Sequence, residues 1–133
     1  MSERIQTHRE LRVYQNAFGV ACSVYDLSKQ FPTDERYSLT DQIRRSSRSV
    51  CANIAEAWRK RRYEAAFIAK LNDAESEAAE TQVWIEFIEQ HGYLDKNICD
   101  ALSKSCDEVI GQLVTMIQNP DKWILRKTKG DKR

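Results

Sequence analysis

The amino-acid sequence predicts an all-α protein, an antiparallel four-helix bundle with up-down-up-down topology. Glycine and proline are scarce, with four and two residues in a chain of 133, which favours long helices over turn-rich β structure. Four segments place apolar residues at intervals of three and four, as one face of a helix requires. The connections between these segments are short, so consecutive helices are expected to run antiparallel.

The first helix is expected over residues 8–30 and carries two apolar stripes instead of one. Phe31 and Pro32 end it, because proline disfavours helical geometry in the residue before it. Gly19 lies inside this helix at a cost of roughly 1 kcal/mol against alanine, so we expect it to allow a close helix contact. The two stripes are Leu11, Tyr14, Phe18, Ala21, Cys22 and Tyr25, and Val13, Ala17, Val20, Val24 and Leu27.

The second helix is expected over residues 39–61, capped by Ser38 with Asp41 three residues later. A short turn near residue 61 separates it from the third helix. One face of the second helix is apolar and the opposite face is basic. The apolar face holds Ile43, Ser47, Val50, Cys51, Ile54 and Trp58, and the basic face holds Arg44, Arg45, Arg48, Arg59 and Arg62.

The third helix is expected over residues 63–91, and Gly92 ends it. Asp95 caps the fourth helix, which runs to Gln118 before Asn119 and Pro120 stop it. The main stripe of the third helix is Phe67, Leu71, Ala74, Ala78, Thr81, Ile85 and Ile88, and its second stripe is Ala65, Ala69, Ser76, Ala79, Val83 and Phe87. The stripe of the fourth helix is Ile98, Leu102, Cys106, Val109, Leu113 and Met116.

By this reading residues 1–120 form one bundle domain, and residues 121–133 form a basic tail that is partly disordered and anchored by Trp123. A monomeric bundle needs one buried stripe per helix, yet the first and third helices offer two. We therefore expect a homo-oligomer that covers the extra apolar surface. The alternative is a very broad contact with the core.

Charge is strongly segregated along the chain, although the formal net charge is only +1. Residues 36–62 hold eight Arg or Lys and two acidic residues, whereas residues 63–90 hold seven acidic residues and one Lys. Such local fields can steer a charged partner. The alternative is that the basic and acidic helices neutralise each other inside the bundle.

The arginine row is the best functional candidate, because a planar guanidinium donates two parallel hydrogen bonds to phosphate and stays charged. A row along one helix can follow a polyanionic backbone by counterion release. No aromatic residues interleave with the arginines on that helix face, so we do not expect base stacking. Arg–Glu pairing with the third helix, within or between subunits, is the competing use of the row.

Asn53 and Glu56 are polar residues beside small ones on the second helix. We expect structural roles for both: a hydrogen bond from Asn53 across a helix contact, and a pair between Glu56 and a neighbouring Arg. Contact with a ligand or partner is the alternative.

Nothing in the sequence indicates catalysis. The two histidines, His8 and His91, have no carboxylate at metal-ligand spacing, and no nucleophile–base or phosphate-binding motif occurs. We expect no enzyme activity, no metal and no cofactor, and four cysteines that act as small buried hydrophobes in a reducing compartment. No membrane span or signal peptide is evident, which indicates a cytoplasmic protein.

An ordered series of motifs resembles the four-helix-bundle family of proteins encoded in intervening sequences of 23S ribosomal RNA. The resemblance covers about residues 11–118. The motifs are Leu11-Arg-Val-Tyr-Gln15, Phe31-Pro32, Glu35-Arg-Tyr-Ser-Leu-Thr40, Gln42-Ile-Arg-Arg45, Asn53-Ile-Ala-Glu56 and Gly92-Tyr93-Leu94.

This family includes an accessory protein of diversity-generating retroelements, which forms a ring-like pentamer, binds nucleic acid and works with a reverse transcriptase. The resemblance therefore implies a homopentamer, RNA or DNA as a partner, and a protein partner such as a reverse transcriptase. Arg44 and Arg45 fall on its Ile-Arg-Arg motif, which makes them candidates for nucleic-acid contact. A protein-interaction scaffold without nucleic-acid binding is the alternative function.

Overall fold

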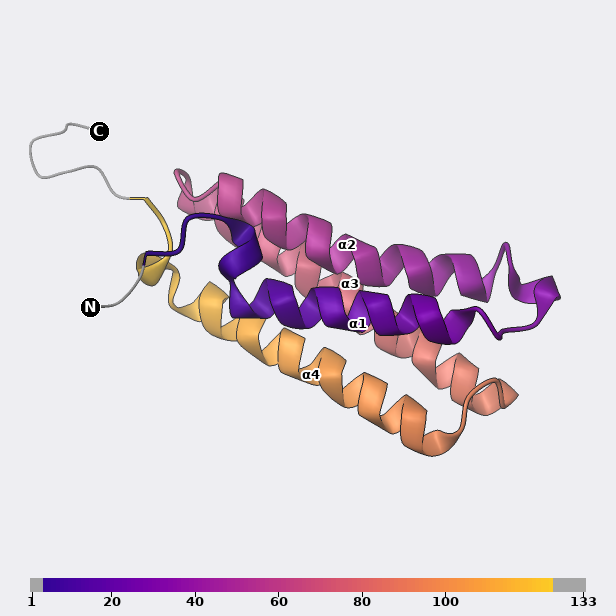
Figure 1. Ribbon diagram of the computed structural model, residues 1–133. Helices are drawn as coiled ribbons and strands as arrows, with labels where there is room; N and C mark the ends of the chain where they lie inside the picture. Colours follow the sequence, from indigo (N-terminus) through magenta and orange to yellow (C-terminus); the bar gives the residue numbers. More distant parts are fainter. Residues whose placement is uncertain (1–3, 126–133) are drawn as a thin grey trace, which may run out of the picture.

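The computed structural model describes residues 4–125, and four α-helices make up most of this part of the chain (Figure 1). They are α1 (Arg12–Ser28), α2 (Leu39–Arg59), α3 (Glu64–His91) and α4 (Lys96–Gln118). Short 3-10 helices accompany them: η1 (His8–Glu10), η2 (Thr33–Glu35) and η3 (Pro120–Lys122). The described residues contain no strand, which confirms the predicted all-α class and the four helices.

Each helix packs against the next one along the chain, and α1 also packs against α4, so the four helices enclose the interior of the bundle. The α1–α2 loop and the α3–α4 turn lie at one end of the bundle (Figure 1). The α2–α3 turn, η1 and η3 lie at the other end (Figure 1). The short connections force this antiparallel order.

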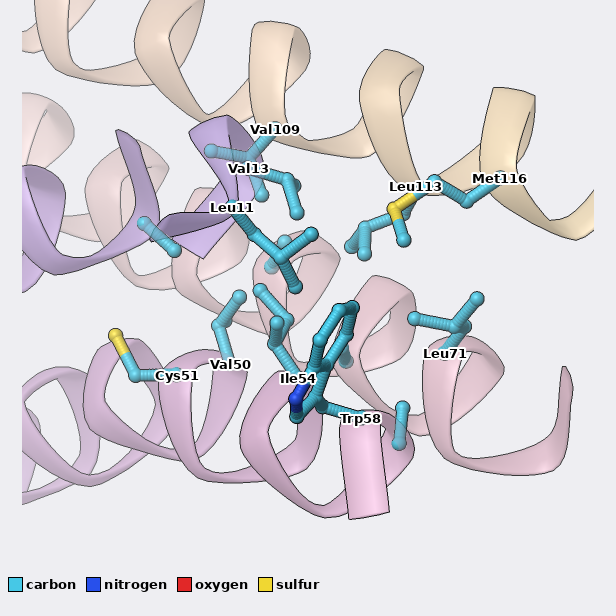
Figure 2. Packing of buried hydrophobic residues seen from close by; sticks show 14 of the residues in the cluster. Leu11, Val13, Val50, Cys51, Ile54, Trp58, Leu71, Val109, Leu113 and Met116 are labelled. Carbon is cyan, nitrogen blue, oxygen red and sulfur yellow. The ribbon is translucent and has the colours of Figure 1, made fainter. Parts of the chain in front are cut away.

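The buried apolar side chains form two clusters, and in the one shown in Figure 2 side chains of all four helices surround Trp58. Every residue of the predicted main stripe of α3 is buried. Most of the residues that α1 contributes to the core come from its second predicted stripe. Phe18 and Tyr25 of the first stripe are 52% and 40% exposed. On α3, Val83 and Phe87 are 43% and 46% exposed. The alternative of a very broad core contact is therefore wrong.

The capping groups at two helix ends are those predicted from the sequence, and the capping group at a third end differs. Gly92 ends α3 with φ of 76°, and Asp95 accepts a 2.9 Å hydrogen bond from the Ile98 amide at the start of α4, as predicted. Ser38 occupies the N-cap of α2, but its hydroxyl caps nothing. It donates to Glu35 at 2.6 Å, and the same carboxylate accepts the Leu39 amide at 3.3 Å. The predicted N-cap position is confirmed, but the expected side-chain cap is absent, because the Ser38 hydroxyl donates to Glu35 instead of accepting from an amide of α2.

Two further expectations about small residues are wrong. Gly19 faces open space, since a Cβ built there meets no atom within 4 Å, so it makes no close helix contact within the described chain. Cys22 is exposed, whereas Cys51, Cys99 and Cys106 are buried as expected.

The chain after α4 stays on the bundle through residue 125, because Trp123 and Ile124 pack against the core. The amide of Leu125 also donates to the carbonyl of Arg61 at 2.8 Å. The rest of the predicted basic tail lies outside the described residues.

Candidate nucleic-acid interface

The five candidate arginines stand on or just after α2, whose apolar face is held in the core by residues such as Ile54 and Trp58. Within residues 4–125, none of the five takes part in an ion pair. Intramolecular pairing with acidic α3 therefore does not consume the arginine row. Four of the five side chains are exposed, and Arg44 is half-buried.

Arg44 and Arg48 lie one turn apart and share a single aromatic partner, Tyr25 of α1. The guanidinium carbons of Arg44 and Arg48 are 4.7 and 5.5 Å from the centroid of the Tyr25 ring, and the Lys29 ammonium is 4.8 Å from it. Arg44 is further fixed by a 2.7 Å hydrogen bond from its Nε to the hydroxyl of Ser28. Cation–π attraction thus gathers three cations around one phenol ring at the end of α1.

A groove of about 650 Å³ runs between α1 and α2 from this cluster. We call it the α1–α2 groove. Three aromatic residues stand on its α1 side, and Arg48 and small residues form its α2 side. Its lining residues are Tyr14, Phe18, Ala21, Cys22, Tyr25, Asp26, Arg48, Cys51, Ala52 and Ala55.

A second, basic hollow continues the groove toward the other end of α2, since Ala55 lines both. Its remaining lining residues are His8, Glu56, Arg59, Lys60 and Lys70. The ring of His8 packs edge-on against Tyr14, with centroids 4.7 Å apart. Burial and the charge of Arg9 lower the pKa of His8, which favours its neutral form. Because Glu56 pairs with Lys70, the hollow owes its net positive charge to Arg59 and Lys60.

The remaining two candidates lie elsewhere, so the predicted row is not one continuous surface. Arg45 faces α3, where its charge acts on Glu77, although burial is stronger and raises the pKa of that carboxyl. Arg62 is exposed on the turn between α2 and α3. The adjacent Arg61 is held in place, because its guanidinium carbon lies 3.3 Å from the centroid of the Trp58 ring.

Asn53 and Glu56 have partners other than the expected ones. The Asn53 amide donates to the Ser49 carbonyl of its own helix at 2.9 Å instead of crossing to a neighbour. Glu56 pairs with Lys70 of α3 at 2.9 Å, where an arginine was expected. Close contact between α2 and α3 is made instead by the hydroxyls of Ser46 and Thr81, 2.8 Å apart.

The aromatic side of this surface was not predicted from the sequence. Phe18 and Tyr25 appeared as part of an apolar stripe of the first helix, and the arginines appeared on the second. Only the rotation of α1 against α2 brings the two sets together. The sequence did contain one indication of this surface. Because the second α1 stripe supplies the core, the aromatic residues of the first stripe were left for another contact.

Two observations bear on other kinds of site. Among residues 4–125, no helix is both long enough and apolar enough to cross a membrane. In the same part of the chain, His, Cys, Asp and Glu side chains do not gather in a group of three or more that would hold a metal ion.

Comparison with known proteins places the chain by sequence and by structure. The solved structure of a protein of unknown function from the S23 ribosomal protein family of Bacteroides thetaiotaomicron is similar, with a TM-score of 0.72 and 29% sequence identity. The match covers 80% of this chain and 95% of that one. None of the curated proteins compared with the chain matches it. A family model described as 23S rRNA-intervening sequence protein matches residues 9–115, and the chain belongs to that family.

Proposed function

We propose that this protein is a non-enzymatic, oligomeric nucleic-acid-binding protein that contacts the phosphates of RNA or DNA through α2. The observation that carries the proposal is the set of arginines that no acidic residue of the described chain neutralises. Arg44, Arg48 and Arg59 supply the main contacts, and Arg45 and Arg62 extend them at the margins. Guanidinium groups suit phosphate because they remain charged and donate in pairs.

Assembly of several copies is the second part of the proposal. The outer face of α3 leaves Val83 and Phe87 exposed beside small residues such as Ala79, and apolar surface of this kind is typical of a subunit contact. A ring, such as the pentamer that the family resemblance implies, would repeat the basic face around its axis. Repetition strengthens binding to a long polyanion without any new contact.

Charge reversal tests the phosphate contacts. Arg44→Glu with Arg48→Glu is expected to weaken binding of a labelled RNA oligonucleotide, measured by fluorescence anisotropy, and to flatten its dependence on salt. Lys104→Glu is the matched control, because Lys104 is exposed on α4 and forms no ion pair in the described residues. Arg59→Glu tests the other end of the surface without disturbing the Tyr25 cluster.

The proposal fails if the wild-type protein binds neither RNA nor DNA at low salt, or if both reversals match the control. A stoichiometric protein partner that survives nuclease treatment would then favour the scaffold function, with a reverse transcriptase as the partner that the resemblance implies.

A further inference from the structure

We infer that the α1–α2 groove binds single-stranded nucleic acid, with bases stacked on the aromatic residues of α1 and phosphates held by the basic residues of α2. This inference rests on the proposed function and names the form of nucleic acid that the surface takes. Phosphate binding alone would not need an aromatic wall.

The aromatic wall of the groove is built mainly from Tyr14 and Phe18 of α1. Tyr14 and Phe18 stack with centroids 5.9 Å apart, and His8 packs on the other side of Tyr14. Phe18 is 52% exposed, so the solvent reaches its ring beside the groove. Tyr25 lies two turns farther on, where Lys29, Arg44 and Arg48 lie against its ring, so it positions the cations beside the wall. Exposed rings in a row match the stacking platforms of single-strand binders, which accept any base because every base has a π face.

The basic wall runs parallel to the aromatic one. Arg44 and Arg59 are fifteen positions apart on α2, which is about 22 Å along the helix axis. Arg48 lies between them and lines the groove directly. Two acidic residues border the groove and the basic hollow, and each forms an ion pair with a lysine. The Asp26 carboxylate lies 3.8 Å from the Lys29 ammonium, and the Glu56 carboxylate lies 2.9 Å from the Lys70 ammonium. The arginines therefore remain available to a polyanion.

A duplex fits this surface less well than a single strand. Bases inside a duplex are stacked on each other and expose only their edges, so they cannot lie flat on Phe18. A second copy of this chain is the other class of occupant. A second copy would have to present its acidic α3, which could pair with the arginines but offers no bases to the aromatic rings. The rings beside the cations therefore favour nucleic acid, whose bases stack while its phosphates meet the arginines.

The first experiment compares a labelled single-stranded DNA of mixed sequence with the duplex of the same sequence, using the full chain. The single strand is expected to bind at least about tenfold more tightly. Phe18→Ala should weaken single-strand binding by about fivefold or more, as alanine substitution of a stacking residue does, and leave duplex binding unchanged. Phe18→Tyr should restore it. Tyr37→Ala is the control, because Tyr37 is 86% exposed and lies outside the groove.

The outcomes separate the inference from the proposed function. Equal binding of both forms, unaffected by Phe18→Ala but weakened by Arg44→Glu with Arg48→Glu, would overturn the inference and leave phosphate binding intact. Binding of neither form would overturn both. A change in oligomeric state with Phe18→Ala, measured by sedimentation velocity, would assign the groove to a second copy and overturn the inference.

Cys22 offers an independent readout, because it is exposed and lines the groove. Bound oligothymidylate is expected to slow alkylation of Cys22 at least severalfold, whereas the same concentration of duplex should not. Unchanged alkylation at saturating single strand would place the nucleic acid elsewhere and contradict the inference.

Discussion

The hydroxyl oxygens of Ser46 and Thr81 lie 2.8 Å apart in the contact between α2 and α3, and both residues are almost completely buried. Thr81 also lies within hydrogen-bond distance of the Glu77 carbonyl at 2.9 Å, and Ser46 of the Ile43 carbonyl at 3.3 Å. Two hydroxyl protons thus serve three contacts. The pair satisfies itself inside the core and allows the two helices to approach closely.

The effects on stability of removing the two hydroxyls should not be additive. Ser46→Ala or Thr81→Val alone is expected to lower the free energy of unfolding by about 1 kcal/mol, because each breaks the same buried hydrogen bond. The double variant should lose clearly less than the sum of the two. Urea unfolding followed by circular dichroism measures this, with exposed Thr115→Val as the control. Additive losses would show that the hydroxyls do not interact.

Gly19→Ala should stabilise the protein. The residue is helical and exposed, and an added Cβ meets nothing within 4 Å, so alanine brings only its better helix propensity, about 1 kcal/mol. Gly92→Ala is the matched opposite, because Gly92 has φ of 76° and an added side chain would be strained there. Thermal unfolding should rank Gly19→Ala above wild type and Gly92→Ala below it. A destabilised Gly19→Ala would indicate a neighbour at this face in the assembled protein.

Stability at low pH should depend on Glu35. Hydrogen bonds from the hydroxyls of Ser38 and Tyr93, the latter at 2.7 Å, lower the pKa of this carboxyl below its usual 4.5. A lowered folded-state pKa gives stability that is full above pH 4.5 and is lost as the pH falls through the folded-state pKa. Between neutral pH and about pH 3, Glu35→Gln should therefore lose less unfolding free energy than wild type. Glu86→Gln, exposed on α3, should behave like wild type.

Arg61→Lys should not be conservative. The Arg61 Nε donates to the Trp58 carbonyl at 2.8 Å, its guanidinium lies over the Trp58 ring, and a terminal nitrogen reaches the Trp123 carbonyl at 3.5 Å. Lysine keeps the charge but cannot stack as a plane, so we expect a loss of about 1–2 kcal/mol. Hydrogen exchange should also speed up at residues 123–125. Arg62→Lys at the adjacent, exposed position is the control. Equal losses of stability in the two variants would contradict the stabilising role of the Arg61–Trp58 contact.

Only Cys22 should react quickly with a thiol reagent in the folded protein near pH 8. Burial raises the pKa of Cys51 to about 11 and that of Cys106 to about 12, and it also raises the pKa of Cys99, so these three hold little thiolate. Ellman's reagent should show one fast equivalent per chain, and four in denaturant. Cys22→Ser should remove the fast phase. Two fast equivalents would show that the bundle opens at one of the three buried cysteines.

Helix positions and the core face of α3 could be predicted because periodicity fixes which side of a helix is apolar. All seven stripe residues of α3, from Phe67 to Ile88, are buried. The capping roles of Gly92 and Asp95 follow from local chemistry alone. Glu35 was missed as the capping group of α2 because its carboxylate comes from the preceding 3-10 helix, outside the usual one-residue cap position.

The sequence predicted the basic residues of the candidate site but not its aromatic residues. The arginines of α2 share a face that one helix determines, so the sequence placed Arg44 and Arg48 together. Their aromatic neighbour comes from α1, and the pairing of Tyr25 with both depends on how two helices rotate against each other. Periodicity within one helix contains no information on that rotation. For the same reason it could not place Arg45 toward α3.

The α1–α2 groove has one wall from each of two helices, so it exists only while α1 is docked. Any molecule that fills it binds the native chain and not the unfolded one. Its occupancy must then raise the free energy of unfolding by RT ln(1 + [L]/Kd), about 2.7 kcal/mol at a hundredfold excess over Kd. A shift in melting temperature therefore reports ligands of this groove without a label, and candidate oligonucleotides can be ranked by heating alone.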